Sequence, residues 1–229
     1  MTYIIAEAGT GHVAENRGVR FALAHGFIQN AARAGANAVK FQMFIADEPL
    51  FCQMPGDEAR MKRWARTALT LDDWQDLTVD AQEHSIDLLW SVFQPTCVEW
   101  MKELKPRYVK VASRAAKTYP YSPGVKYLVS VSSPGMYQPN VSHLYCVPKY
   151  PAPLAECGFR LPYAGLSDHS GTVWPGLGAI YAGAQFLEVH FKIPGADMGN
   201  DEPVCLTTDQ LKLLCEARDA VAAMRPYSG

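Results

Sequence analysis

Two histidines follow strand-like segments in the C-terminal half of the chain. His169 comes just after residues 163–167, and His190 lies near the end of residues 184–191. Imidazole nitrogens are common ligands of divalent transition metals, and water or substrate oxygens complete such sites. We therefore predict that His169 and His190 bind a divalent metal together. The alternative is that each is a separate histidine of the core or rim.

Two lysines lie in strand-like segments whose neighbouring residues are apolar, so Lys40 and Lys110 are predicted to point into a core. A buried ammonium group needs a negative partner or loses its proton. A phosphate or carboxylate ligand would meet that need, and so would a salt bridge to Glu7 or Glu188. Either lysine could instead form an imine with a carbonyl substrate. Glu7 could orient water or a sugar hydroxyl, or simply neutralise the lysines.

These side chains need a scaffold that brings strand ends together. Short β-type segments alternate with helical segments, a pattern typical of a parallel α/β fold. Eight strands are predicted, at residues 3–8, 38–43, 86–91, 108–112, 126–130, 143–147, 163–167 and 184–191. No linker divides the chain, so one domain over residues 1–229 is predicted to form a (β/α)8 TIM barrel, whose chemistry lies at the C-terminal strand ends.

Helix signals separate most of these strands. Asn16 is predicted to cap a helix that ends at Gly35, Thr70 to cap another, and Thr207 with Gln210 to form a capping box. Residues 97–104 and 175–182 are predicted as short helices, whereas residues 44–64 have no assignable pattern. Prolines and glycines interrupt residues 118–125 and 132–140. We therefore predict a reduced barrel in which loops replace helices 4 and 5.

The missing helices would expose the outer faces of the fifth and sixth strands to water. The residues predicted on these faces are Tyr127, Val129, Leu144 and Cys146. An exposed apolar surface of this size calls for a partner, so we predict a homodimer. The alternative is that the loops themselves fold over the strands, through Tyr119, Tyr121, Tyr137 and Pro139.

Composition excludes several classes of protein. The chain has 229 residues, 48% of them hydrophobic, and a formal net charge of −2 without a long basic run. Neither nucleic acid nor an anionic membrane surface is therefore an expected partner. The sequence has neither a transmembrane stretch nor a signal-peptide pattern, which predicts a cytoplasmic protein that acts on small molecules. Its six cysteines form no C-x-x-C pair and are predicted to be reduced and buried.

Six segments occur in an order that is typical of one enzyme family. They read IIAEAGTGH, AGANAVKFQ, YVKVAS, YPAP, GLSDHSG and LEVHF. From Tyr3 to about Val221 the chain resembles the sialic acid synthase (NeuB-like) barrel family, without its C-terminal antifreeze-like domain. The resemblance implies condensation of phosphoenolpyruvate with an N-acylated amino sugar. It also implies a divalent metal, commonly manganese, with Mg, Fe, Co or Zn as other candidates.

The same resemblance implies roles for ten residues. It assigns His169 and His190 to the metal. It assigns phosphoenolpyruvate binding to Lys40, Lys110, Ser113 and Ser167. The remaining four, placed around the metal and the sugar, are Glu7, Gln42, Tyr150 and Asp197, the last in a PGAD segment that resembles the family's GPD. Of these ten, Glu7, Lys40 and Lys110 are the predicted catalytic residues.

The chain also departs from the family pattern. Arg114 and Ala115 stand where the family has Gly-Glu, Pro148 replaces an asparagine, and residues 91–94 read SVFQ instead of STPF. These changes predict a synthase with an altered or smaller acceptor, and Arg114 could replace an arginine of the absent domain. Two other functions remain open. One is a catalytically degenerate barrel that binds a sugar phosphate or a partner chain, and the other is an imine-forming aldolase or lyase.

Overall fold

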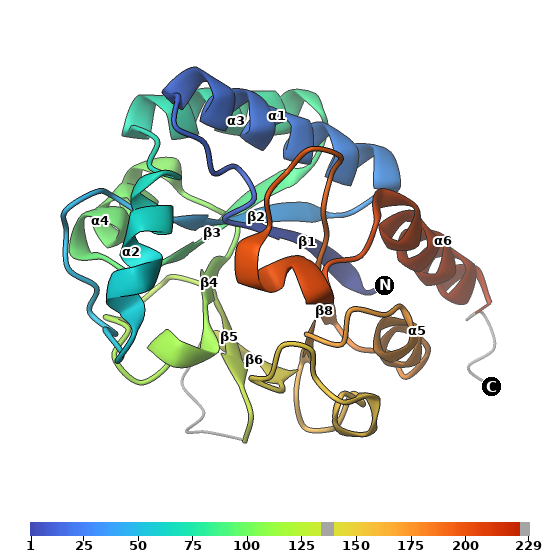
Figure 1. Cartoon of the computed structure of the whole chain (residues 1–229). Coiled ribbons are helices and arrows are strands. Elements are labelled where there is room, and N and C mark those ends of the chain that lie inside the picture. Colours follow the sequence, from blue (N-terminus) through green and yellow to red (C-terminus); the bar gives the residue numbers. More distant parts are fainter. Residues whose placement is uncertain (134–139, 225–229) are drawn as a thin grey trace.

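The computed structural model describes residues 1–133 and 140–224, and they form a closed barrel of eight parallel strands (Figure 1). The strands are β1 (Tyr3–Gly9), β2 (Ala38–Met43), β3 (Asp87–Val92), β4 (Val109–Val111), β5 (Tyr127–Val131), β6 (Val141–Cys146), β7 (Gly165–Asp168) and β8 (Phe186–His190). Each strand pairs with the next, and β1 also pairs with β8, which closes the barrel. The predicted (β/α)8 fold is confirmed.

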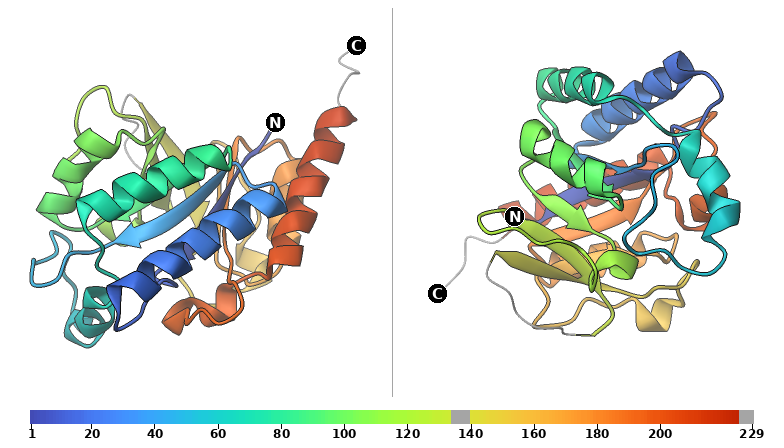
Figure 2. Two further views of the ribbon diagram at one scale, coloured as in Figure 1. Left: turned by 90° about the horizontal axis from the view of Figure 1, so that it is seen from above. Right: turned by 90° about the vertical axis from the view of Figure 1, so that its left-hand side faces the viewer.

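Helices cover only part of the barrel (Figure 2). They are α1 (Arg17–Ala34), α2 (Asp57–Ala65), α3 (Leu71–Glu83), α4 (Pro95–Leu104), α5 (Trp174–Tyr181) and α6 (Thr208–Ala223). The side chains of Asn16, Thr70 and Thr207 accept hydrogen bonds from the first turns of α1, α3 and α6, as predicted. Helix α2 lies within the segment that had no assignable pattern.

Short 3-10 helices or loops replace α-helices on the side of β4 to β7. The β4–β5 connection contains only the turn η1 (Ser113–Ala115), in agreement with the predicted loss of helix 4. The β5–β6 connection, where helix 5 was predicted to be lost, includes residues 134–139, which lie outside the described residues. The β6–β7 connection holds only η2 (Leu154–Glu156), a reduced connection beyond the two that the sequence predicted.

The loop after η1 covers the outer face of β5. Tyr119 and Tyr121 contact the Tyr127 ring edge-on, with ring centroids 5.6 and 5.0 Å apart. Tyr127 and Val129 are therefore buried within a single chain. Tyr137 and Pro139, the other loop residues expected here, lie outside the described residues. This cover removes the reason for which a homodimer was predicted, and the homodimer itself stays an untested prediction.

The prediction that Leu144 and Cys146 lie on the outer face of β6 was wrong. Leu144 packs inside the barrel with Ile5 and Leu128, and Cys146 lines the cavity above them. The outward residue between them is Tyr145, which packs against the Tyr163 ring. Both faces of a buried parallel strand are largely apolar, so hydrophobicity alone does not reveal which face points inward.

The barrel interior has an apolar floor. Its buried residues are Ile5, Ala38, Leu89, Leu128, Leu144 and Phe186. Strand β7 contributes Gly165, where a Cβ atom would lie 2.2 Å from the Phe186 carbonyl oxygen, so only glycine allows β7 and β8 to approach this closely. Two residues further along several strands, the inward side chains become polar. The fold therefore holds a polar layer on an apolar floor, at the C-terminal strand ends.

All six cysteines are buried and free, as predicted. Within the described part of the chain, no helix combines the length and the apolar character needed to cross a membrane.

His12 lies buried beneath the loop after β1. Its Nε2 donates a hydrogen bond to the Thr67 carbonyl, 3.0 Å away, and its ring packs edge-on against Phe41 and Trp74. Burial lowers the pKa of His12 to about 3. Because this pKa lies below that of an unfolded histidine, the unfolded chain takes up the proton first as the pH falls. His12 therefore makes the fold less stable below about pH 6.5.

We expect the His12→Phe variant to have a flatter pH profile of stability than the parent chain. Between pH 7 and pH 5 the parent should lose about 2 kcal/mol more unfolding free energy than the variant, because the variant lacks this titration. Urea denaturation at the two pH values measures the difference. Equal losses in the two proteins would contradict the assignment.

Candidate functional site

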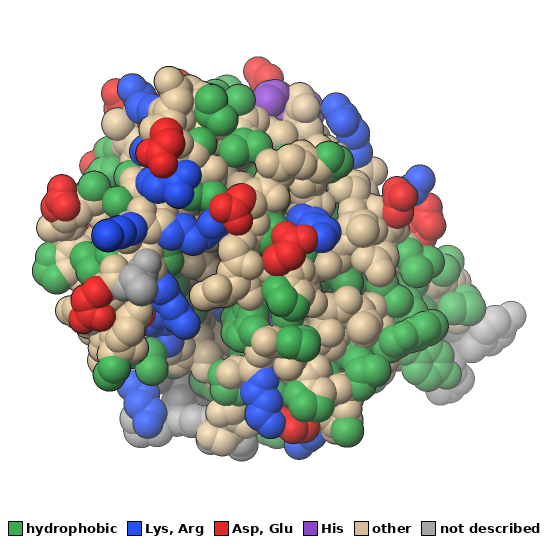
Figure 3. All heavy atoms as spheres, in the orientation of Figure 1, with side chains coloured by type: hydrophobic (Ala, Val, Ile, Leu, Met, Phe, Trp, Pro, Cys, Tyr) green, Lys and Arg blue, Asp and Glu red, His purple; other side chains and the backbone are tan. Residues whose placement is uncertain are grey.

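One cavity of about 1410 Å³ opens at the C-terminal ends of the strands. All ten residues that the sequence predicted for the site line it: Glu7, Lys40, Gln42, Lys110, Ser113, Tyr150, Ser167, His169, His190 and Asp197. Lys and Arg side chains surround the hollow beside α2 (Figure 3). The barrel has thus brought together residues from both ends of the chain, as the predicted fold requires.

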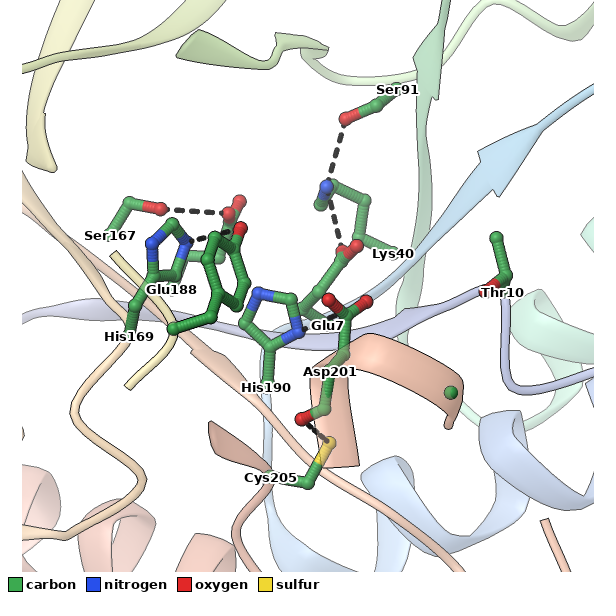
Figure 4. A network of polar contacts seen from close by, with 12 residues as sticks. Glu7, Thr10, Lys40, Ser91, Ser167, His169, Glu188, His190, Asp201 and Cys205 are labelled. Atoms are coloured by element: carbon green, nitrogen blue, oxygen red, sulfur yellow. Dashed lines mark hydrogen bonds and ion pairs between the residues drawn. The ribbon is translucent and has the colours of Figure 1, made fainter. Parts of the chain in front are cut away.

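Four buried charged side chains form the deep part of this cavity. Lys40 Nζ lies 2.7 Å from Glu7 Oε2 and donates a hydrogen bond to Ser91 Oγ at 2.8 Å (Figure 4). Lys110 Nζ donates to Ser130 Oγ at 2.7 Å and lies 3.5 Å from an oxygen of Glu188. All four charged residues are at most 3% exposed. The two lysines are therefore compensated by two carboxylates in the barrel interior.

The four groups differ in how readily they hold a proton. Burial alone would lower the pKa of Lys40, but the Glu188 and Glu7 carboxylates raise it above its usual range. Burial lowers the pKa of Lys110 despite the attraction of Glu188. Burial raises the pKa of Glu7 despite Lys40, whereas Lys110 and Lys40 overcome burial and lower the pKa of Glu188. Glu7 is thus the carboxylate of this group best suited to take up and release a proton.

His169 and His190 face one another above this layer, with ring centroids 5.3 Å apart. His169 Nδ1 donates to the Val147 carbonyl at 2.9 Å, so its Nε2 keeps a lone pair, toward which the Tyr150 hydroxyl points at 3.1 Å. Burial lowers the pKa of His169 to about 4 and lowers that of His190 as well. Both rings are therefore neutral near pH 7.

These two histidines have the chemistry of metal ligands. A ligating imidazole commonly donates its other ring N–H to a carbonyl, as His169 does to Val147. The buried Nδ1 of His190 has no hydrogen-bond partner among the described residues and lies 3.8 Å from Asp201 Oδ2. The described residues contain no group of three or more His, Cys, Asp or Glu side chains arranged for a metal. The pair fits a divalent ion whose other ligands are water or substrate.

The other predicted residues differ in how closely they approach this centre. Ser167 Oγ donates to Glu188 at 3.0 Å, and Tyr150 stacks on His169 with centroids 4.2 Å apart. Gln42 and Ser113 line the cavity wall. Asp197 lies at the rim, 62% exposed, and pairs with Arg63 at 2.7 Å. The carboxylate that faces His190 belongs instead to Asp201.

Several cavity residues were missed by the sequence analysis. Asp201 comes from η3 (Gly199–Val204), four residues after Asp197, and only the folded loop distinguishes the two carboxylates. Arg60 and Arg63 come from α2, and its acidic first turn and basic last turn are a helix signal that is visible in the sequence. Ser130 was detectable, because it lies two residues after inward Leu128 on β5.

The residues that depart from the family pattern differ in whether they reach the cavity. Ala115 is fully buried in the outer core, so its position contributes no polar group to the cavity. Arg114 does line the cavity, and its guanidinium pairs with Asp57 of α2 and donates to the Cys52 carbonyl at 3.0 Å. Gln94 turns away from the cavity and binds the backbone of Ile45. Arg114 therefore lines the cavity at the family's glycine position, and the next position, Ala115, supplies no carboxylate.

Known proteins are similar to this chain over nearly its whole length. The model of the NeuB family matches residues 27–136 and 124–227. The N,N'-diacetyllegionaminic acid synthase of Campylobacter jejuni is 26% identical, over 93% of this chain and 74% of its own length. The spore coat polysaccharide biosynthesis protein SpsE of Bacillus subtilis is 27% identical, over 92% of this chain and 65% of its own length.

A solved structure supports the same barrel. The N-acetylneuraminic acid (sialic acid) synthetase of Leptospira borgpetersenii superposes with a TM-score of 0.74 at 21% identity. The alignment covers 100% of this chain and 86% of the Leptospira chain. At 21% sequence identity, this structural similarity establishes the fold alone.

We expect the Glu188→Gln substitution to destabilise the protein by about 3–5 kcal/mol, because it leaves the buried lysines with too little negative charge. The matched control is Glu156→Gln, which removes the exposed pair of Lys149 and Glu156, 2.8 Å apart, and should cost less than about 1 kcal/mol. Urea denaturation of the two variants measures both costs. Similar costs would show that the buried network does not depend on Glu188.

Proposed function

The chain belongs to the NeuB family, and from this premise we propose that it is a metal-dependent synthase that joins phosphoenolpyruvate to an aldehyde or sugar. One observation carries the proposal. The cavity places two buried lysines, from β2 and β4, opposite a pair of neutral histidines after β7 and in β8. The first pair suits an anionic substrate and the second a divalent cation.

The deep lysines would bind phosphoenolpyruvate by exchanging partners. Lys40 and Lys110 already point at carboxylate and hydroxyl oxygens, so phosphate or carboxylate oxygens of the substrate can replace some of these contacts without exposing a bare charge. The hydroxyls of Ser91 and Ser130 fix the two ammonium groups in place. Ser113 and Ser167, which also line the cavity, complete the proposed binding set.

His169 and His190 would hold the metal, with manganese as the first candidate. When bound there, a divalent cation supplies Lewis acidity that polarises the carbonyl of the acceptor. The chain's own contribution is to keep both rings neutral by burial, and the Val147 carbonyl fixes the orientation of the His169 ring. Asp201, 3.8 Å from His190, adds a negative charge at the same place.

The proposed reaction forms one carbon–carbon bond and breaks one carbon–oxygen bond. C3 of phosphoenolpyruvate attacks the aldehyde carbon of the acceptor, and water adds at C2. The bond between C2 and the phosphate oxygen then breaks, which gives a 2-keto acid and phosphate. The two water hydrogens end on the new hydroxyl and on the released phosphate. Glu7, whose pKa is raised by burial, would carry a proton between these oxygens.

We propose that the acceptor differs from the N-acylated amino sugars that the family resemblance implies. The family glutamate is replaced by Ala115, whose side chain lies in the core, and Arg114 takes the adjacent place in the cavity wall. An acceptor that this glutamate would bind by a hydroxyl therefore loses that contact.

An imine-forming aldolase is the second candidate, and one observation favours Lys110 as its nucleophile. Burial lowers the pKa of Lys110, whereas Lys40 is held protonated by Glu188 and Glu7. An unprotonated amine is needed to attack a carbonyl. Lys110 nonetheless lies opposite the histidine pair, which suits a metal, and an imine-forming aldolase needs no metal. The combination therefore supports anion binding by Lys110 better than imine formation.

The proposed function is tested by phosphate release from phosphoenolpyruvate with a panel of aldoses and aldehydes, with and without manganese. We expect release only when acceptor, metal and enzyme are all present, and mass spectrometry of the product should show acceptor plus pyruvate. Lys110→Met should reduce kcat/KM by at least about a hundredfold, as loss of a buried charged contact does. Tight metal binding without turnover on any acceptor would favour the degenerate barrel.

We expect His169→Ala and His190→Ala each to abolish retention of manganese during dialysis, because each removes one of only two protein ligands proposed here. The exposed His84 on the barrel's outside provides the control, and His84→Ala should retain the metal as the parent does. Elemental analysis of the dialysed proteins gives the readout. Full retention of metal by both cavity variants would place the site elsewhere.

Borohydride reduction in the presence of pyruvate separates the synthase from the aldolase. We expect no covalent adduct, since the lysines serve as charged anion contacts in the proposed reaction. Intact-mass spectrometry measures this directly. An added mass of one reduced pyruvate, lost in the Lys110→Arg variant, would instead establish imine formation at Lys110.

A further inference from the structure

Three arginines line the outer part of the cavity, beside α2. Arg60 and Arg63 lie one helical turn apart on α2, and Arg114 follows β4. Side chains three residues apart lie on one face of a helix, so α2 presents two guanidinium groups to the same space. In Figure 3 positively charged side chains gather at this edge of the hollow. The deep lysines of β2 and β4 belong to a separate, inner layer.

Arg63 is held firmly in this rim. Its guanidinium donates to Asp197 Oδ2 at 2.7 Å and to Thr10 Oγ1 at 3.2 Å. It also packs flat against Gly199, where an added Cβ would lie 2.8 Å from the Arg63 Cζ atom. Gly199 has a φ of +57°, a conformation that favours glycine. Arg63 therefore links the end of β1 to η3 and builds one wall of the outer cavity.

Arg114 is likewise occupied. It pairs with Asp57 at the start of α2, and its guanidinium lies 5.7 Å from the centre of the Trp64 ring. This ion pair connects η1 to α2. The charges of Arg63 and Arg114 are thus each balanced by a carboxylate.

Arg60 differs from both. It is exposed, and it makes no hydrogen bond or ion pair with any residue that the structure describes. Arg60 nonetheless lines the cavity, on the same helix as Arg63. Arg60 therefore directs a positive charge toward the cavity without a carboxylate of its own.

We infer that the acceptor carries a phosphate or carboxylate at the end remote from its aldehyde, and that Arg60 binds this group. This inference rests on the proposed function and specifies the substrate class of the same site. The guanidinium group of Arg60 can donate hydrogen bonds to two oxygens of either anion. The contacts of Arg63 and Arg114 fix the position of α2, which carries Arg60. With its aldehyde near His169 and His190, such an acceptor would extend outward to the rim.

Binding of polyols that lack an aldehyde, and therefore cannot react, tests this inference independently of turnover. The probes are glucitol, glucitol 6-phosphate and gluconate, titrated calorimetrically into the manganese-loaded chain at saturating phosphoenolpyruvate. We expect one of the two anions to bind at least about tenfold more tightly than glucitol, since a charge-assisted hydrogen bond is worth that factor or more. Preference for the phosphate or for gluconate identifies which anion the rim selects.

Two substitutions on the same helix provide the matched comparison. Arg60→Gln should lower the preference for the anion about tenfold, and Arg60→Lys should restore part of it. Lys62→Gln removes the same charge from α2 outside this cavity and should leave the preference unchanged. Equal binding of glucitol and both anions, or a preference that survives in Arg60→Gln, would overturn the inference.

Activity on matched aldoses separates this inference from the proposed function. Phosphate release is compared for N-acetylmannosamine and its 6-phosphate, and for glucose, glucose 6-phosphate and glucuronate. A higher kcat/KM for an anionic aldose, lost in Arg60→Gln, supports both proposals. Turnover that is equal on neutral and anionic aldoses overturns the role of Arg60 and leaves the synthase intact. Absence of turnover on all five, with tight binding of an anionic alcohol, rejects the synthase and supports the anion site.

Discussion

Charge compensation inside the barrel is the constraint on which the site depends. Lys40 and Lys110 are at most 3% exposed, and a bare ammonium group in this position would cost several kcal/mol. Glu7 and Glu188 supply the opposite charges, and the hydroxyls of Ser91 and Ser130 each accept one further hydrogen bond from a lysine. The network is therefore stable without a ligand, yet it is made of the groups that an anionic substrate can bind.

The barrel produces this arrangement by simple repetition. Inward residues on the strands are apolar at the floor and polar two positions later, so the strands deliver lysines, glutamates, serines and histidine to one level. The reduced side of the barrel does not disturb that layer, because tyrosines of the β4–β5 loop seal β5 from outside. The chain has thus lost helices on one side while the polar layer above the floor remains complete.

Much of the fold and of the candidate site was predictable from the sequence, because strand alternation and strand ends determine which side chains lie close together. All ten predicted residues line the cavity, although their chemical roles remain predictions. The errors occurred where local pattern carries too little information. Strand β6 is buried on both faces, so Leu144 and Cys146 were placed outside. Asp197 and Asp201 share one loop, and only its fold turns Asp201 toward His190. The cover by Tyr119 and Tyr121 was one of two alternatives that the sequence left open, because tertiary contacts of a loop cannot be read from periodicity.

The central claim is that the buried lysines exchange carboxylate partners for phosphoenolpyruvate. Calorimetric titration of phosphoenolpyruvate into the parent chain and into Lys110→Met tests it most directly, because it requires neither an acceptor nor turnover. The account predicts binding to the parent and an affinity at least about a hundredfold weaker in the variant, in line with the cost of removing a buried charged contact. Equal affinity in the two proteins, with the variant still folded, would contradict it.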